Sequence, residues 1–145
     1  MVRVYVLAEG LATSAAELAT AYGVTAARLE LMYLLGQRGP LIQREIAYHL
    51  DCTPRQVTAF VDGLSTSGHV ERATPENDRR RKVVRLTALG EEVVDEITAA
   101  RSEMAHDMFK DLAPGDVQAF ERVLEHVIGV LGFRKTVEPA SEMQA

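Results

Sequence analysis

The sequence has few of the residues that would build a disulfide-rich, membrane-spanning or aromatic-rich protein. Its 145 residues include one cysteine, Cys52, no tryptophan and only 6% aromatic residues. A single cysteine excludes an internal disulfide and a cysteine-based zinc cluster, and it fits a reducing compartment. No run reaches the roughly 18 apolar residues of a membrane-spanning helix, and the apolar run near the N-terminus is too short for a signal-peptide core. We therefore expect a cytoplasmic protein.

What the chain does contain is the composition of a globular protein of about one domain, 47% apolar and 26% charged. Its net charge of −5 at first argues against nucleic acid as a partner. However, residues 41–87 hold eight basic and six acidic side chains, a net charge of +2, so the rest of the chain carries −7. The acidity therefore belongs to the two ends, and the centre is mildly basic.

The spacing of apolar residues predicts mostly helices. We expect helices over 4–21, 26–37, 41–50, 53–65, 88–112 and 115–131, and strands over 69–74 and 82–87. The strongest local signal is Thr53-Pro54-Arg55-Gln56, because Thr is a favoured N-cap, Pro suits the first helical position and Gln completes a capping box. The apolar stripe of that helix is expected to be Val57, Phe60, Val61 and Leu64.

This order predicts a mainly α fold with a small β-hairpin wing: a winged helix-turn-helix domain with terminal helices that form a dimerisation region. We assign 1–22 to an N-terminal dimerisation helix, 23–87 to the winged helix-turn-helix, 88–133 to C-terminal dimerisation helices and 134–145 to a frayed tail. The terminal helices keep apolar faces with little core of their own to cover, which favours a homodimer. The alternative is that they fold over one monomeric core.

The centre of the chain resembles the MarR family of transcriptional regulators (multiple antibiotic resistance regulators). The resemblance covers about residues 20–132 and is carried by Gln43-Arg44-Glu45-Ile46-Ala47, by Val61-Asp62-Gly63-Leu64, and by the wing sequence from Asp78 to Gly90. In the wing, an Asp and an Arg two residues later precede Leu-Thr and a Gly that opens the long helix. The resemblance implies a homodimeric repressor with two DNA-binding lobes, released by a small aromatic or phenolic ligand or by oxidation.

The chain departs from the family pattern at two places in this region. Ala59 stands where the family often has a basic residue, and Asp51 replaces the usual turn glycine. Asp tolerates the left-handed conformation better than most residues, so we expect the turn to survive.

A helix-turn-helix places its second helix in the major groove of DNA. With the apolar stripe inward, the residues left for DNA are Thr53, Arg55, Gln56, Thr58 and Ala59, together with Asp62. Arg55 has the chemistry to read guanine; alternatively, it contacts only phosphate. Gln56 has the chemistry to read adenine; alternatively, its side chain is engaged in the capping box. Ala59 offers a methyl group to a thymine, and Thr53 combines capping with a phosphate contact.

The predicted hairpin tip is strongly basic, with Arg79, Arg80, Arg81 and Lys82 in succession. Arg80 matches the family's wing arginine, and we expect it to enter a minor groove. We expect Arg79, Arg81 and Lys82 to contact the phosphate backbone, which adds affinity without sequence information. Asp78, together with Asp62, is expected to position the wing by holding a neighbouring arginine.

A ligand and a redox switch are the two forms of regulation that the resemblance implies. Candidate residues of a ligand pocket are Tyr22, Arg28, Met32, Tyr33 and Met108, although for each of them core or surface packing is the favoured interpretation. Cys52 lies at the turn, where it behaves as a small buried hydrophobe or, alternatively, as an oxidation switch.

No other chemistry is indicated by the sequence. The four histidines (49, 69, 106 and 126) lack metal-ligand spacing, so we expect no metal and no cofactor. No Ser-His-Asp signature, phosphate-binding glycine loop or His-Glu-x-x-His motif is present, so we expect no enzyme. The alternatives to a ligand-responsive repressor are a winged-helix protein-interaction module without operator binding and a redox-responsive regulator that uses Cys52.

Overall fold

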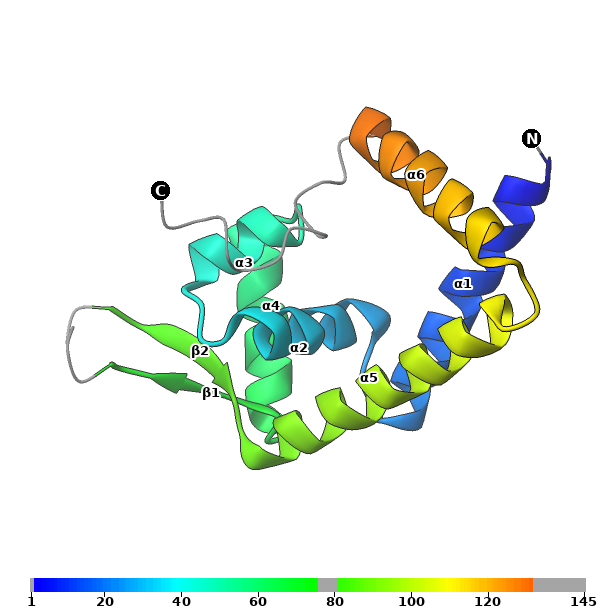
Figure 1. The fold of residues 1–145 in the computed structure, drawn as a ribbon. Coiled ribbons are helices and arrows are strands. Elements are labelled where there is room, and N and C mark those ends of the chain that lie inside the picture. The colour runs from blue at the N-terminus through cyan, green and yellow to red at the C-terminus, as the bar shows by residue number, and fades with distance from the viewer. Residues whose placement is uncertain (1, 76–80, 132–145) are drawn as a thin grey trace. The chain divides into compact units, whose positions relative to one another are not determined.

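The computed structural model describes residues 2–75 and 81–131. Its elements are α1 (Val2–Ala21), α2 (Ala26–Arg38), α3 (Gln43–His49), α4 (Pro54–Thr66), β1 (Val70–Ala73), β2 (Val83–Leu86), α5 (Ala88–Phe109) and α6 (Pro114–Leu131). The predicted fold class, mainly α with a small β-hairpin, is confirmed (Figure 1). Asp78, Arg79, Arg80 and the predicted tail over 134–145 lie outside the described residues.

The chain forms two compact units, residues 1–95 and residues 96–145, with the division inside α5. The first unit holds α1 to β2 and the start of α5. Helix α2 contributes five buried residues to the unit's core, of which Leu29, Leu31 and Met32 are at most 1% exposed. Helix α2 packs on α1, α3, α4 and β2, so it is the central element of this unit. The hairpin projects beyond the helices (Figure 1).

Helix α4 packs on α2 and α3 through the apolar stripe expected from the sequence. Val57, Val61 and Leu64 are completely buried, whereas Phe60, expected with them, is only half-buried. The turn before α4 confirms the expectation for Asp51, which adopts a left-handed conformation with φ 49°. The connection between α3 and α4 therefore remains short without a glycine.

Several predicted element boundaries were wrong by one to three residues. The third helix begins at Gln43 and not at Leu41, because Leu41 pairs with β2: its N–H donates to the Val84 carbonyl at 3.1 Å, and the Val84 N–H donates back at 2.7 Å. Pro114 was expected to interrupt the chain but is the first residue of α6, where a missing N–H costs nothing. Helix α5 ends at Phe109, three residues before the expected end.

The Leu-Thr-x-x-Gly sequence joins the base of the hairpin to the start of α5. The Thr87 N–H donates to the His69 carbonyl (3.0 Å), and the Thr87 hydroxyl donates to the Gly68 carbonyl (2.6 Å). The same hydroxyl oxygen accepts from the Gly90 N–H (3.2 Å). A Cβ atom on Gly90 would lie 2.1 Å from the His69 carbonyl oxygen, so only glycine allows this approach.

The second unit contains the rest of α5 and all of α6. The rings of Phe109 and Phe120 pack at a centroid distance of 5.6 Å, which joins the end of α5 to α6. No residue of α6 is buried. Over the described ranges, no helix combines the length and apolar character needed to cross a membrane.

Candidate nucleic-acid interface

The interface begins at the N-terminus of α4, where the capping box predicted from the sequence is present. The Thr53 hydroxyl oxygen accepts from the Gln56 N–H at 3.3 Å. In return, Gln56 Oε1 accepts from the Thr53 N–H at 2.9 Å and from the Thr53 hydroxyl at 2.8 Å. A bidentate contact with adenine needs both the oxygen and the nitrogen of this amide. Because the oxygen is engaged twice, the structure shows Gln56 in its capping role.

The remaining expected DNA-contacting residues of α4 are solvent-exposed. Arg55 is exposed and has no hydrogen-bond or ion-pair partner among the described residues, so its guanidinium is available to a base or a phosphate. Thr58 is exposed, although its hydroxyl donates to the Pro54 carbonyl at 3.0 Å. Ala59 is exposed and presents only a methyl group.

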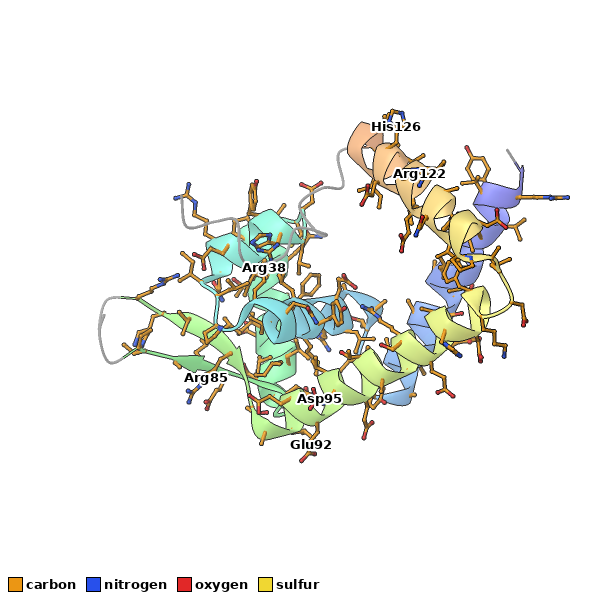
Figure 2. All side chains as sticks on the ribbon, in the orientation of Figure 1. Arg38, Arg85, Glu92, Asp95, Arg122 and His126 are labelled. Carbon is orange, nitrogen blue, oxygen red and sulfur yellow. The ribbon has the colours of Figure 1, made fainter. Side chains whose placement is uncertain are left out.

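The wing is an antiparallel hairpin in which Val70 pairs with Leu86 and Ala73 pairs with Val83. Its arginines are held by carboxylates. Arg72 of β1 binds Asp62 of α4 at 2.5 Å, and Arg85 of β2 binds Glu71, its cross-strand partner, at 2.6 Å. Figure 2 shows Arg85 on the hairpin. These pairs fasten the strands to each other and to the recognition helix.

The two described residues of the basic tip also have partners. Arg81 Nη2 lies 3.1 Å from Glu45 Oε1 of α3, and Lys82 Nζ donates to the Thr74 hydroxyl at 2.6 Å. The positive charge of this part of the wing is therefore partly neutralised within the chain. Helix α5 begins with the opposite charge, since Glu92 and Asp95 are exposed there (Figure 2).

Sequence reasoning missed four members of these ion pairs: Arg72, Arg85, Glu71 and Glu45. The hairpin register could have revealed Glu71, because residues directly opposite on two strands interact. Arg72 and Glu45 had no such signal, since their partners lie 10 and 36 residues away in the sequence. Asp62, expected to hold a wing arginine, binds Arg72 of β1.

The five candidates for a ligand pocket occupy different environments. Met32 is completely buried in the core, while Tyr22, Arg28 and Tyr33 are half-buried. The guanidinium of Arg28 lies against Gly63 of α4, where an added Cβ atom would come within 2.3 Å of Arg28 Cζ.

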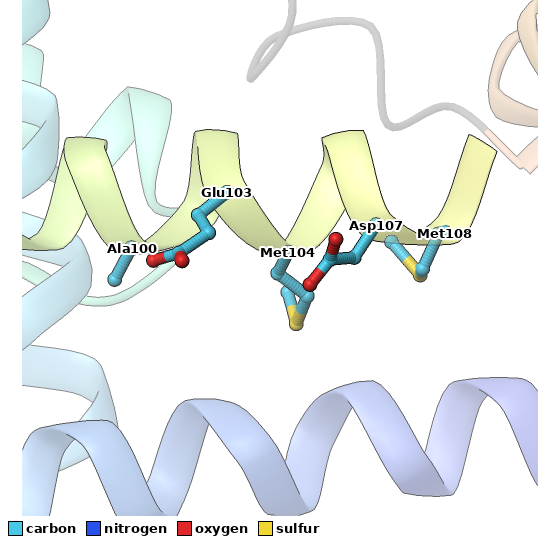
Figure 3. A pocket seen from close by; sticks show the side chains of 5 residues that line it. All are labelled: Ala100, Glu103, Met104, Asp107 and Met108. Atoms are coloured by element: carbon cyan, nitrogen blue, oxygen red, sulfur yellow. The ribbon is translucent and has the colours of Figure 1, made fainter. Parts of the chain in front are cut away.

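Met108 lines a shallow depression of about 450 Å³ on α5. Its other lining residues are Ala100, Glu103, Met104 and Asp107, and all five side chains project from the same side of the helix (Figure 3). Asp107 also binds Lys110 at 2.9 Å.

Cys52 precedes the capping residue of α4 and is half-buried. Burial raises the pKa of its thiol, and the neighbouring carboxylate of Asp51 raises it further. At neutral pH the thiol is therefore protonated, and a protonated thiol is a poor nucleophile. Within the described part of the chain, no three His, Cys, Asp or Glu residues are grouped so that they could hold a metal ion.

The fold and the exposed face of α4 beside a hairpin define a winged helix-turn-helix protein. Residues 24–82 match the model of the MarR family. The chain is 28% identical to the HTH-type transcriptional regulator YwoH of Bacillus subtilis over 78% of this chain and 82% of the relative. It is 27% identical to the HTH-type transcriptional repressor IacR of Pseudomonas putida over 69% of this chain and 60% of the relative.

Solved structures show the same fold. The MepR–DNA complex of S. aureus superimposes with a TM-score of 0.72 over 88% of this chain and 93% of the other, at 20% identity. Residues 24–82 of this chain therefore match the MarR family, and its relatives are named HTH-type transcriptional regulators.

Proposed function

We propose that the protein is a cytoplasmic, ligand-responsive repressor that binds a pseudo-palindromic operator as a homodimer. The observation that carries the proposal is the exposed face of α4, where Arg55 has no partner among the described residues, beside a hairpin held to α4 by the Arg72–Asp62 ion pair. In a helix-turn-helix this face enters the major groove. The repressor role is supported by the relative IacR, which is named a repressor, and DNA binding by MepR, which was solved bound to DNA.

The dimer is supported by exposed apolar side chains on both terminal helices. Their side chains are 41–73% exposed: Val4, Tyr5, Val6, Leu7 and Leu11 on α1, and Phe120, Val123, Leu124, Val127, Val130 and Leu131 on α6. Apolar surface of this extent is typical of an interface. We therefore assign 1–22 and 88–133 to dimerisation and 23–87 to DNA binding.

The dimer is tested with one pair of variants on α6. Val127→Glu places a charge on the apolar face, whereas Gln118→Glu places the same charge nine residues away, on the opposite side of the helix. We expect sedimentation to show a dimer for the wild type and for Gln118→Glu, and a shift toward monomer for Val127→Glu. A monomeric wild type would refute the dimer.

Operator binding is proposed to divide between α4 and the wing. On α4, Arg55 contacts guanine or phosphate, Thr53 contacts phosphate, and Thr58 and Ala59 approach the bases. On the wing, Arg80 enters a minor groove, Arg79 and Lys82 contact phosphates, and Asp78 positions an arginine. Bound fragments selected from random DNA should then contain two half-sites about one helical turn apart. Selection of a single, non-palindromic site would contradict a symmetric dimer.

Arg80→Ala tests the contribution of the wing. We expect it to lose most operator binding in a gel-shift titration while circular dichroism and sedimentation remain those of the wild type. Unchanged affinity would remove the wing from the interface.

The effector is proposed to be a small aromatic or phenolic compound that contacts the depression containing Met108. Two carboxylates and no basic side chain line this depression, which favours an uncharged phenol over an aromatic acid. We expect a substituted phenol to raise the melting temperature and to release operator DNA, and a benzoate of similar size to do neither. Release by the benzoate alone would contradict this assignment. The proposal makes no use of Cys52, because its raised pKa opposes a thiolate switch.

A further inference from the structure

The start of α3 and the start of β2 are fastened together at two levels. The first is the pair of backbone hydrogen bonds between Leu41 and Val84 described above. The second is the ion pair between Glu45 and Arg81, two side chains that lie 36 residues apart in the sequence. The segment that leads from the wing tip into β2 is thereby attached to the helix-turn-helix.

Glu45 performs two tasks with one carboxylate. Its Oε2 atom accepts from the Ile42 N–H at 2.8 Å, which satisfies a free donor at the N-terminus of α3. Its Oε1 atom lies 3.1 Å from Arg81 Nη2, and Oε2 lies 3.4 Å from the same nitrogen. The cap fixes the Glu45 carboxylate independently of Arg81. Forming the ion pair therefore costs less side-chain conformational entropy than it does for an ordinary surface pair.

Arg81 and Lys82 are adjacent but have different partners. Arg81 binds Glu45 on α3, whereas Lys82 donates to the Thr74 hydroxyl after β1. A phosphate that recruited Arg81 would have to displace a fixed carboxylate and would then lie close to it, with unfavourable like-charge repulsion. The hydroxyl partner of Lys82 presents no such negative charge.

We propose that Arg81 is a positioning residue, which holds the wing against α3 through Glu45, and not a ligand of the DNA backbone. This replaces the sequence-based expectation of a phosphate contact for Arg81. It rests on the proposed function in one respect, namely that the wing contacts DNA.

The test compares Glu45→Gln with Arg81→Ala in operator titrations at several salt concentrations. Glutamine keeps an oxygen for the α3 cap but removes the charge that holds Arg81. If Arg81 positions the wing, each variant weakens binding by about two- to fivefold. The double variant should be no weaker than either single one, because both remove the same interaction. The slope of log K against log salt should stay at its wild-type value.

The opposite role predicts effects of different sign. If Arg81 bound phosphate, Glu45→Gln would release it and strengthen binding, and Arg81→Ala would lower the magnitude of the salt slope by about 0.9. Either result would overturn the proposal. Arg81→Ala leaves the α3 cap untouched, so it remains informative if Glu45→Gln disturbs folding.

Two controls separate this proposal from the proposed function. Lys82→Ala should lower the salt slope, which shows that the assay detects a lost phosphate contact at the neighbouring residue. Arg80→Ala reports on the wing as a whole. If Arg80→Ala binds like the wild type, the wing is not at the DNA and the wing's part of the proposed function fails. If it loses binding while Glu45→Gln and Arg81→Ala do not, only the positioning role fails.

Discussion

Gly90→Ala is expected to destabilise the protein through a single backbone contact. The added Cβ atom would lie 2.1 Å from the carbonyl oxygen of His69, at the base of the wing. This oxygen cannot rotate away as a side chain would, because it accepts from the Thr87 N–H at 3.0 Å. The start of α5 must therefore move away from the hairpin.

The magnitude follows from three contributions. Alanine in place of glycine gains at most about 1 kcal/mol of helix propensity. Against this, overpacking costs about 1–3 kcal/mol, and weakening the hydrogen bond from Thr87 costs about 1 kcal/mol. We expect a net loss of about 2 kcal/mol, which corresponds to a fall of about 4–8 °C in the melting temperature.

The assay is thermal unfolding at one fixed protomer concentration, with two glycine variants for comparison. A Cβ on Gly115 of α6 would meet no atom within 4 Å, so Gly115→Ala should be neutral or slightly stabilising. A Cβ on Gly36 would lie 2.6 Å from Val94 Cγ1, a side chain that can shift, so Gly36→Ala should fall between the other two. A Gly90→Ala protein as stable as Gly115→Ala would refute the reasoning.

Three further predictions concern the recognition helix α4 and the turn before it. Thr53→Ala removes the cap and should cost about 1 kcal/mol in urea unfolding; an unchanged midpoint would contradict the capping role. Gln56→Ala should weaken binding by the same factor on all operator sequences, because its amide oxygen is engaged in the capping box; a loss confined to one base pair would show that it reads a base. Because the pKa of Cys52 is raised, the native thiol should react with iodoacetamide more slowly than a free thiol at pH 7–8, and faster as the pH rises; rapid reaction at pH 7 would restore the redox alternative.

The parts of the fold that were predicted correctly depend on interactions within a few residues. The Thr53–Gln56 capping box spans three residues, and the left-handed turn at Asp51 depends on the conformational preference of one residue. The buried stripe of α4 follows from helical spacing alone. Phe60 is only half-buried, because helical spacing predicts which face of the helix a side chain occupies but not how closely other elements pack against it. The two errors at Leu41 and Pro114 have different causes. Leu41 pairs with a strand more than 40 residues away, which periodicity does not reveal. Pro114 was read as a helix breaker, although proline is also favoured at the first position of a helix.

By itself, the sequence determined the element types, the cap of α4, the mildly basic centre and the resemblance to the MarR family. Only the tertiary structure decided which charges of that basic centre are used within the chain. Arg72, Arg81 and Arg85 look equally available in the sequence, yet each has a carboxylate partner in the fold. The physical reason is that a cap or a periodicity is decided by neighbouring residues, whereas an ion pair depends on where two distant segments meet.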